Sequence, residues 1–358
     1  MSYILAIVVF GLLIFVHELG HFIVAKLSDI TVLQFTIGFG PAIFKKQVGE
    51  TLYAIRLLPL GGAVMMQGEE DEDTEKLLTG EKEFSVDERT LSPEGSFAEA
   101  SLPKRFAVCV AGAAMNFLTG VVILMLVLAP AAAVVDPTIS DFAPGFALQG
   151  ENGLQVGDRI TKINGFRVFV YSDLQMGLTM GEGKTYDITV ERNGQKVTLE
   201  DVSLSRQVFE GETTPRFGIT FSYKEFSGLE KAGYAVKNAV SFLQSACKSI
   251  GMLLTGEAST GDMMGVVGIA DQMTDLAQEE DNSSFWYFVA YLAVNLGFVN
   301  MLPIPGLDGG KILVILLEAV LRRPIPEKYQ NIIAVVGLVC ILGLFVFVTL
   351  NDIRRLVG

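Results

Sequence analysis

Half of this 358-residue chain is hydrophobic and only 19% is charged, whereas soluble domains carry about 25% charged residues. The 40 acidic residues outnumber the 27 basic ones, for a net charge of −13; this excludes a nucleic-acid binder, whose surface would be basic. Of the three cysteines, Cys109 and Cys340 stand inside apolar runs, which excludes a disulfide framework. The chain therefore has either an unusually large core or a place in a lipid bilayer.

Four apolar runs are long enough to cross a bilayer, which takes roughly 20 residues. The first covers residues 3–25, and no Lys or Arg precedes Lys26, so it lacks the basic start of a cleaved signal peptide. The others cover residues 106–135, 285–320 and 331–350. The third is interrupted by Pro303, Pro305 and Gly306. We therefore predict a polytopic α-helical membrane protein with four spans.

Basic residues set the expected orientation, because they favour the cytoplasmic face of a membrane. Lys26, Lys104, Arg105 and the loop at residues 322–328 all fall on one side of the four spans. We expect that side to be cytoplasmic and both chain termini to lie outside, although two arginines near the C-terminus point the other way.

Two β-rich stretches, residues 32–39 and 51–66, follow the first span. They are rich in β-branched, aromatic and glycine residues, and residues 47–50 form a turn between them. We predict a small membrane-associated sheet, here called the β-loop. The acidic run at residues 69–75 comes next and is expected to be a solvated stretch with no chemistry of its own.

The outer loop between the second and third spans is large enough for a domain. It contains the pattern GLxxGDxIxxING from Gly153, followed by VxRNG and FGI, in which Asn-Gly turns separate short alternating strands. This order resembles a PDZ domain over residues 136–223, and such domains capture extended peptides or free C-termini by adding a strand to a sheet edge. An unrelated small β-barrel is the alternative.

A predicted amphipathic helix follows this module. Its apolar residues step by four and three positions along one face: Val236, Val240, Leu243, Cys247, Ile250 and Leu254. We expect the stripe to lie against the membrane surface or the β-rich module, without a catalytic role.

The first span carries the motif His17-Glu18-Leu19-Gly20-His21. Residues four apart project from one face of a helix, so both imidazoles can bind one metal ion, with Glu18 placed to take a proton from water. Ionisable residues are costly inside an apolar span and are usually functional there. The alternative is a His-Glu-His group that only joins helices through hydrogen bonds.

A hydrolytic zinc site usually has three protein ligands and one position open to water. The chain has only two histidines, so the third ligand is a carboxylate, a thiolate or absent. Asp308 is the candidate carboxylate, because the prolines and glycines around it break the third span, and irregular backbone at that depth lines a cavity or is buried in protein. Glu318, by contrast, is expected at the surface. As an alternative, Asp308 caps the helix that follows it.

Four patterns occur together along nearly the whole chain. They are HELGH from His17, GFGP at residues 38–41, Lys104-Arg105 with Ala111-Gly112 and Asn116, and NxxPxPxLDGG from Asn300. In combination they resemble the site-2 protease family of intramembrane zinc metalloproteases, with the bacterial regulator-of-sigma-E protease as the nearest type. The family's usual Gly-Pro before the second-span Asn is Gly112-Ala113 here, and the single PDZ-like module fits the single-PDZ members.

The resemblance implies Zn²⁺ held by His17, His21 and Asp308, with Glu18 as general base. It implies that four further residues contact the substrate or shape its path: Asn300, Asn116, Pro303 and Pro305. The substrates would be transmembrane proteins or peptides, such as anti-sigma factors or signal-peptide remnants, in the bacterial inner membrane. The β-loop would pair with the unwound substrate. The PDZ-like module would exclude substrates with bulky outer domains, or bind a C-terminus left by an upstream protease.

The expected organisation has eight parts. They are the first span with HExxH (1–27), the β-loop (28–68), an acidic cytoplasmic loop (69–103), the second span (104–135), the PDZ-like domain (136–223), an amphipathic helical region (224–284), the broken third span with LDG (285–321), and the fourth span with the C-terminus (322–358).

Two other functions fit parts of the sequence. One is a membrane-tethered PDZ scaffold whose metal site is structural or inactive. The other is an ion or metal transporter, because polar residues and broken helices at membrane depth are also transporter features. Inverted repeats would support a transporter, but the HExxH and LDG segments share no pattern.

Overall fold

The computed structural model describes residues 2–69, 95–148, 150, 153–181, 185–209, 213–256, 265–323, 325–326, 337, 339 and 343. The chain divides into two compact units, Met1–Ile123 with Ser249–Gly358 and Leu124–Lys248. The unit boundaries fall inside α3 (Leu102–Leu128) and α5 (Gly228–Thr255).

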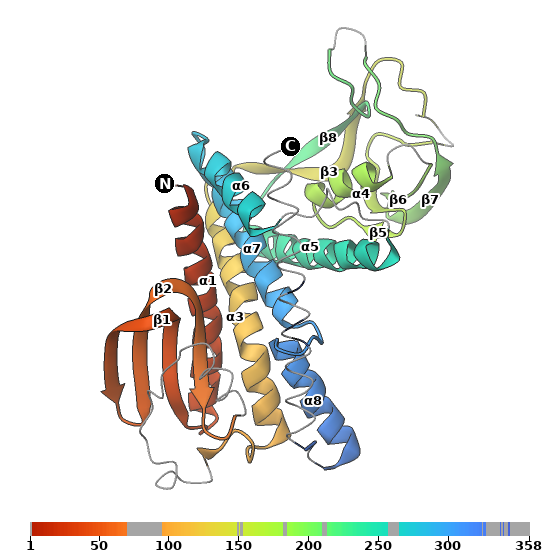
Figure 1. The fold of residues 1–358 in the computed structure, drawn as a ribbon. Coiled ribbons are helices and arrows are strands. Elements are labelled where there is room, and N and C mark those ends of the chain that lie inside the picture. Colours follow the sequence, from red (N-terminus) through yellow and green to blue (C-terminus); the bar gives the residue numbers. More distant parts are fainter. Residues whose placement is uncertain are drawn as a thin grey trace. The chain divides into compact units, whose positions relative to one another are not determined.

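Long apolar helices form the first unit. Among the residues described, two helices are long and apolar enough to cross a membrane, Ile4–Leu27 within α1 (Ser2–Leu27) and Leu102–Leu128. α7 (Ser283–Asn300) lies beside them (Figure 1). Glycines bring these helices close, since a Cβ at Gly297 of α7 would lie 2.8 Å from the Ala113 carbonyl oxygen of α3.

The predicted break in the third span is present. α7 ends at Asn300, and α8 (Asp308–Leu321) begins only after a turn. The predicted fourth span lies outside the described residues, apart from residues 337, 339 and 343. α3 ends at Leu128, earlier than the predicted end at 135, because Pro130 cannot continue the helix and Val134 and Val135 pair with β8 instead.

The predicted β-loop consists of β1 (Val32–Val48) and β2 (Thr51–Met66). Thr36 lies opposite both Ala54 and Ala63, so the first half of β1 sits between two segments of β2. The sheet lies against α1 (Figure 1). Several of its apolar side chains are exposed: Ile43, Phe44, Val48, Ile55, Leu57 and Leu58.

The side chains of two acidic residues expected in solvent are only 8% and 7% exposed. Glu69, the first residue of the acidic run, accepts a hydrogen bond of 2.8 Å from Lys311 of α8. Glu318, also on α8, accepts one of 2.8 Å from Arg105 of α3. The expectation of a solvated position is wrong for both, because each carboxylate meets a cation from a distant part of the chain. Residues 70–94 lie outside the described part of the chain.

The second unit is built on a six-stranded sheet in the order β7-β6-β4-β3-β8, with β5 paired to β4. Its strands are β3 (Ala133–Phe142), β4 (Arg159–Ile163), β5 (Phe166–Arg167), β6 (Tyr186–Arg192), β7 (Gln195–Val202) and β8 (Ile219–Glu225). Asn164-Gly165 and Asn193-Gly194 form the predicted tight turns, with positive φ at all four residues. The core is a cluster of buried side chains that includes Ile139, Leu154, Ile160, Ile163, Leu174, Tyr186, Ile188 and Val190.

Helix α4 (Tyr171–Met180) and helix α5 complete the second unit (Figure 1). The buried face of α5 carries three alanines and one phenylalanine, Ala235, Ala239, Ala246 and Phe242, with Asn238 and Ser241. Ser241 donates a hydrogen bond of 2.5 Å to Asp173 of α4. The predicted stripe is therefore largely on the other face, where Val236 is 44% and Val240 37% exposed.

Candidate metal centre

The two histidines of the first span and the aspartate of the broken span come together. His17 Nε2 lies 3.0 Å from Asp308 Oδ2, His21 Nε2 lies 3.3 Å from the same oxygen, and the two Nε2 atoms lie 3.2 Å apart. The two histidines are 6% and 7% exposed. The helix α1 presents both imidazoles on one face, and the turn between α7 and α8 delivers the carboxylate.

The protonation of these groups favours a bound cation. His21 Nδ1 lies 2.7 Å from the Val108 carbonyl oxygen, which can only accept, so the neutral imidazole carries its proton there and Nε2 has a lone pair. Asp308 Oδ2 is buried and has no hydrogen-bond partner in the described part of the chain. Two facing acceptors repel each other unless a cation lies among them.

The spacing of the three atoms fits zinc. A tetrahedral site with metal–ligand bonds of about 2.0–2.1 Å has ligand atoms about 3.3–3.4 Å apart. The observed separations of 3.0, 3.2 and 3.3 Å are close to this edge length. Two imidazoles and one carboxylate are also a ligand set of hydrolytic zinc sites, which keep a fourth position open.

Gly112 of α3 leaves room for this cluster. A Cβ at this position would lie 2.7 Å from His17 Cε1 and 2.8 Å from His17 Nε2, and still closer to His21 Nε2. Contacts under 3.0 Å are too short for a carbon atom. The absence of a side chain at Gly112 is therefore needed for both imidazoles to stand where they do.

Glu18 lies between the two histidines on α1, facing the β-loop. A Cβ at Gly62 of β2 would come within 2.9 Å of Glu18 Cγ. Gly62 itself pairs with Ile37 in the sheet. The strand segment of β2 at this glycine therefore passes directly over the Glu18 side chain.

The other predicted site residues divide into two groups. Asn116 Nδ2 lies 3.4 Å from His17 Nδ1, and Asn300 Nδ2 lies 3.4 Å from His17 Nε2. Pro303 and Pro305 stand in the turn before α8; Pro303 is exposed, and Pro305 packs against Gly337. The structure thus brings both asparagines to the cluster, whereas the prolines shape the turn that carries Asp308.

Sequence reasoning missed two neighbours of the cluster. The Val108 carbonyl is a backbone group and has no signal in the sequence. Lys311 lies three residues after Asp308 and pairs with Glu69, 242 positions away. A lysine one turn after the candidate ligand was the available signal for this pair.

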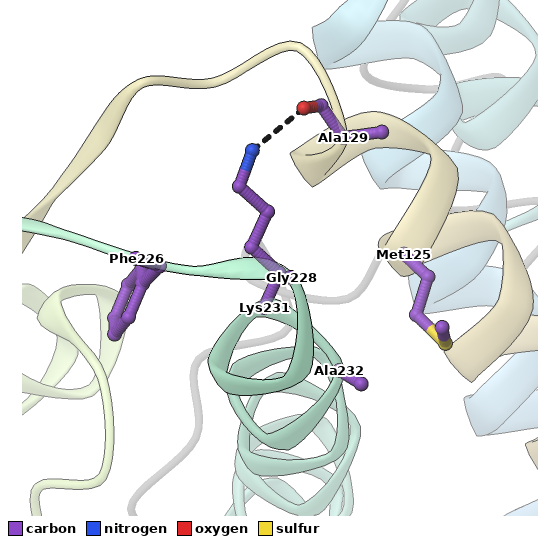
Figure 2. A pocket seen from close by; sticks show the side chains of 6 residues that line it. All are labelled: Met125, Ala129, Phe226, Gly228, Lys231 and Ala232. Atoms are coloured by element: carbon purple, nitrogen blue, oxygen red, sulfur yellow. Dashed lines mark hydrogen bonds between the residues drawn. The ribbon is translucent and has the colours of Figure 1, made fainter.

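A separate hollow of about 370 Å³ lies in the second unit. Its lining is Met125, Ala129, Phe226, Gly228, Lys231 and Ala232, and Lys231 donates a hydrogen bond of 2.6 Å to the Ala129 carbonyl (Figure 2). None of the predicted site residues lines it.

The chain is similar to known proteins along nearly its whole length. A model of peptidase family M50 matches residues 5–344. The chain belongs to peptidase family M50. This is the site-2 protease family that the sequence motifs resemble, so that prediction is confirmed.

Three curated relatives align with 98–99% of the chain. A protein of Clostridium perfringens, provisionally named a zinc metalloprotease, is 35% identical over 99% of this chain and 98% of its own length. The zinc metalloprotease RasP of Bacillus licheniformis is 31% identical over 98% of each chain. The regulator of sigma-W protease RasP of Bacillus subtilis is 29% identical over 98% of this chain and 97% of its own. The chain is therefore a membrane zinc metalloprotease, a hydrolase with Zn²⁺ as its cofactor.

Proposed function

We propose that this M50 peptidase cleaves peptide bonds in or near transmembrane segments, with zinc held by His17, His21 and Asp308. One observation carries the proposal: the three convergent ligand atoms include two from a helix that is long and apolar enough to cross a membrane. Nitrogen and oxygen ligands buried at such depth are costly and usually functional.

Glu18 acts as the general base in this proposal. When bound, zinc lowers the pKa of a water molecule and polarises the scissile carbonyl. The Glu18 carboxylate takes a proton from the attacking water and returns it to the leaving amine nitrogen. Its neighbours on α1, His17 and His21, keep it next to the reacting atoms.

The β-loop would hold the substrate extended. A carbonyl inside an intact helix is hydrogen-bonded and shielded, so the substrate must unwind before cleavage. The β2 segment that passes over Glu18 at Gly62 offers backbone groups close to the metal ligands. Asn300, beside His17 at the end of α7, would donate a hydrogen bond to the substrate.

The substrates would include membrane-embedded anti-sigma factors. A relative whose name is regulator of sigma-W protease supports this substrate class.

The variant Glu18→Gln tests the catalytic assignment. Glutamine has a similar shape but cannot hold the transferred proton, so cleavage of a transmembrane substrate by purified protein in detergent should fall at least about a hundredfold, with zinc content unchanged. Glu279→Gln, at an exposed glutamate after α6 (Val266–Gln278), is the matched control and should cleave normally. Cleavage by Glu18→Gln at the wild-type rate would remove Glu18 from the mechanism.

We place four spans in the bilayer, with both termini and the β-rich unit outside and the acidic loop in the cytoplasm. The natural cysteines give a direct test, because Cys247 of α5 is exposed whereas Cys109 is buried. In a Cys340→Ala background, a membrane-impermeant thiol reagent should label the protein in intact cells and should not label it after the further change Cys247→Ala. If Cys247 reacts only after the cells are opened, the orientation is inverted.

The β-rich unit would act as a PDZ-like filter that excludes substrates with bulky outer domains, or would bind a C-terminus left by an upstream protease. In support, β8 lies at the edge of its sheet and pairs only with β3 among the described strands. Replacing residues 136–223 by a short linker should preserve zinc and broaden substrate choice. Unchanged selectivity would argue against a filter, and zinc binding without any cleavage by the wild-type protein would favour the alternative, a PDZ scaffold.

A further inference from the structure

We propose that Asn116 is a positioning residue, which accepts a hydrogen bond from His17 Nδ1 and so directs the His17 Nε2 lone pair toward the metal. The inference rests on the proposed assignment of His17 as a zinc ligand. It gives Asn116 a different task from the substrate contact that the family resemblance implies.

The first observation concerns the Asn116 amide. Asn116 is 0% exposed, and its Nδ2 lies 3.4 Å from His17 Nδ1. Its Oδ1 is buried without a hydrogen-bond partner in the described residues. A buried amide oxygen without a hydrogen-bond partner destabilises the folded protein. The full burial also leaves Asn116 no surface with which to touch a substrate.

Exchanging the positions of the Asn116 amide oxygen and nitrogen gives the oxygen a hydrogen-bond partner. The oxygen and nitrogen of an asparagine amide occupy nearly the same volume, and their assignment follows from the hydrogen bonds around them. With the two atoms exchanged, Oδ1 faces His17 Nδ1 and accepts its proton. His17 Nε2 is then unprotonated, as a zinc ligand must be.

The second observation is a repeat along α3. Val108, Gly112 and Asn116 are spaced by four residues and so lie on one face of the helix. The Val108 carbonyl accepts from His21 Nδ1 at 2.7 Å, Gly112 leaves the space that the two rings fill, and Asn116 meets His17 Nδ1. One face of α3 thus supplies an acceptor for each imidazole, and such partners orient the ligands of metal sites.

The test measures which ring nitrogen of each histidine carries the proton. The chain has two histidines, so labelling with ¹⁵N-histidine gives only four ring-nitrogen signals, whose shifts distinguish the two neutral tautomers. In metal-free wild-type protein at alkaline pH, in detergent, both rings should carry the proton on Nδ1. A His17 proton on Nε2 in this sample would overturn the proposal, even if no variant could be purified.

Variants separate the hydrogen bond from packing. Asn116→Leu is similar in size but offers no acceptor; it should move the His17 proton toward Nε2, leave His21 unchanged, and weaken zinc binding about 10–100-fold. Asn116→Asp restores an acceptor and should restore the tautomer and most of the zinc affinity. Thr119→Val, whose hydroxyl bonds Met115 within the same helix, is the matched control.

The outcomes also separate this inference from the proposed function. An Asn116→Leu protein with an unchanged His17 tautomer and wild-type zinc affinity contradicts the positioning role while leaving the zinc site intact. Failure of wild-type protein to bind zinc through His17 contradicts the proposed function, whatever the tautomer in the metal-free state.

Discussion

The buried carboxylate Asp158 of the β-rich unit and the His17-His21-Asp308 cluster of the helical unit are arranged in opposite ways. In the β-rich unit, Asp158 is 1% exposed and accepts hydrogen bonds from Arg192 Nε and Nη2, both at 2.7 Å, and from the Gln155 amide. In the helical unit, two imidazole nitrogens and a carboxylate oxygen converge with no donor among them once His17 and His21 carry their protons on Nδ1.

Asp173 in the β-rich unit follows the same rule as Asp158. Burial raises its pKa, while hydrogen bonds from Ser241 and from the amides of Val170 and Phe169 favour the charged form and limit the rise. A buried carboxylate that accepts hydrogen bonds from protein side chains and backbone amides needs no metal ion, so its role is structural. A cluster of acceptors facing one another needs an ion, and this difference distinguishes the site from other buried polar groups.

Filling the space between the imidazoles should have the largest effect. Gly112→Val places carbon atoms where the structure allows none, so purified protein should lose stoichiometric zinc, as measured by metal analysis after gel filtration. Gly233→Val, on α5 with open space around it, is the control and should retain zinc. A Gly112→Val protein with one zinc per chain would show that the rings do not require this gap.

Removing the structural carboxylate should act on stability alone. Asp158→Ala leaves Arg192 without its carboxylate partner, with only the Gly153 carbonyl accepting from Nη2, and leaves the Gln155 amide without an acceptor, at a cost of about 3–5 kcal/mol. Thermal unfolding in detergent should show the second unit melting earlier, with zinc content unchanged below that transition. Loss of zinc at temperatures where the second unit is still folded would contradict the claim that Asp158 acts on stability alone.

Replacing both members of an ion pair in the helical unit should have the smallest effect on stability. Arg105 Nη1 donates a hydrogen bond of 2.8 Å to Glu318 Oε2, so the two residues should behave like the pairs of the β-rich unit. Replacing both residues by methionine should change the unfolding free energy little, since buried ion pairs are often exchanged for apolar residues at no cost. The single variant Glu318→Met should be clearly less stable than the double variant, and equal stability of the two would contradict the pairing.

Much of the site was accessible from the sequence because it depends on local spacing. Two histidines four apart share a helix face wherever that helix lies, and prolines near Asp308 interrupt a span in any fold. The Asn-Gly turns of the β-rich unit are local in the same sense.

The rest depends on contacts that the sequence does not encode locally. α5 carries two apolar stripes with the same helical period, and only the fold shows that Ala235 and Ala239 pack inward while Val236 is exposed. The burial of Glu69 depends on Lys311, and the orientation of His21 depends on a backbone carbonyl. A carbonyl has no residue type by which it could be recognised.

The most direct measurement of the central claim is the zinc affinity of Asp308→Ala, determined by competition with a chelator and compared with wild type and with Asp281→Ala, an exposed aspartate before α7. Wild-type protein and Asp281→Ala should bind one zinc ion per chain with equal affinity. Asp308→Ala should bind it at least tenfold more weakly, because the site loses one of three ligands. If Asp308→Ala keeps one zinc ion per chain at wild-type affinity, the third ligand lies elsewhere and the account of this site is wrong.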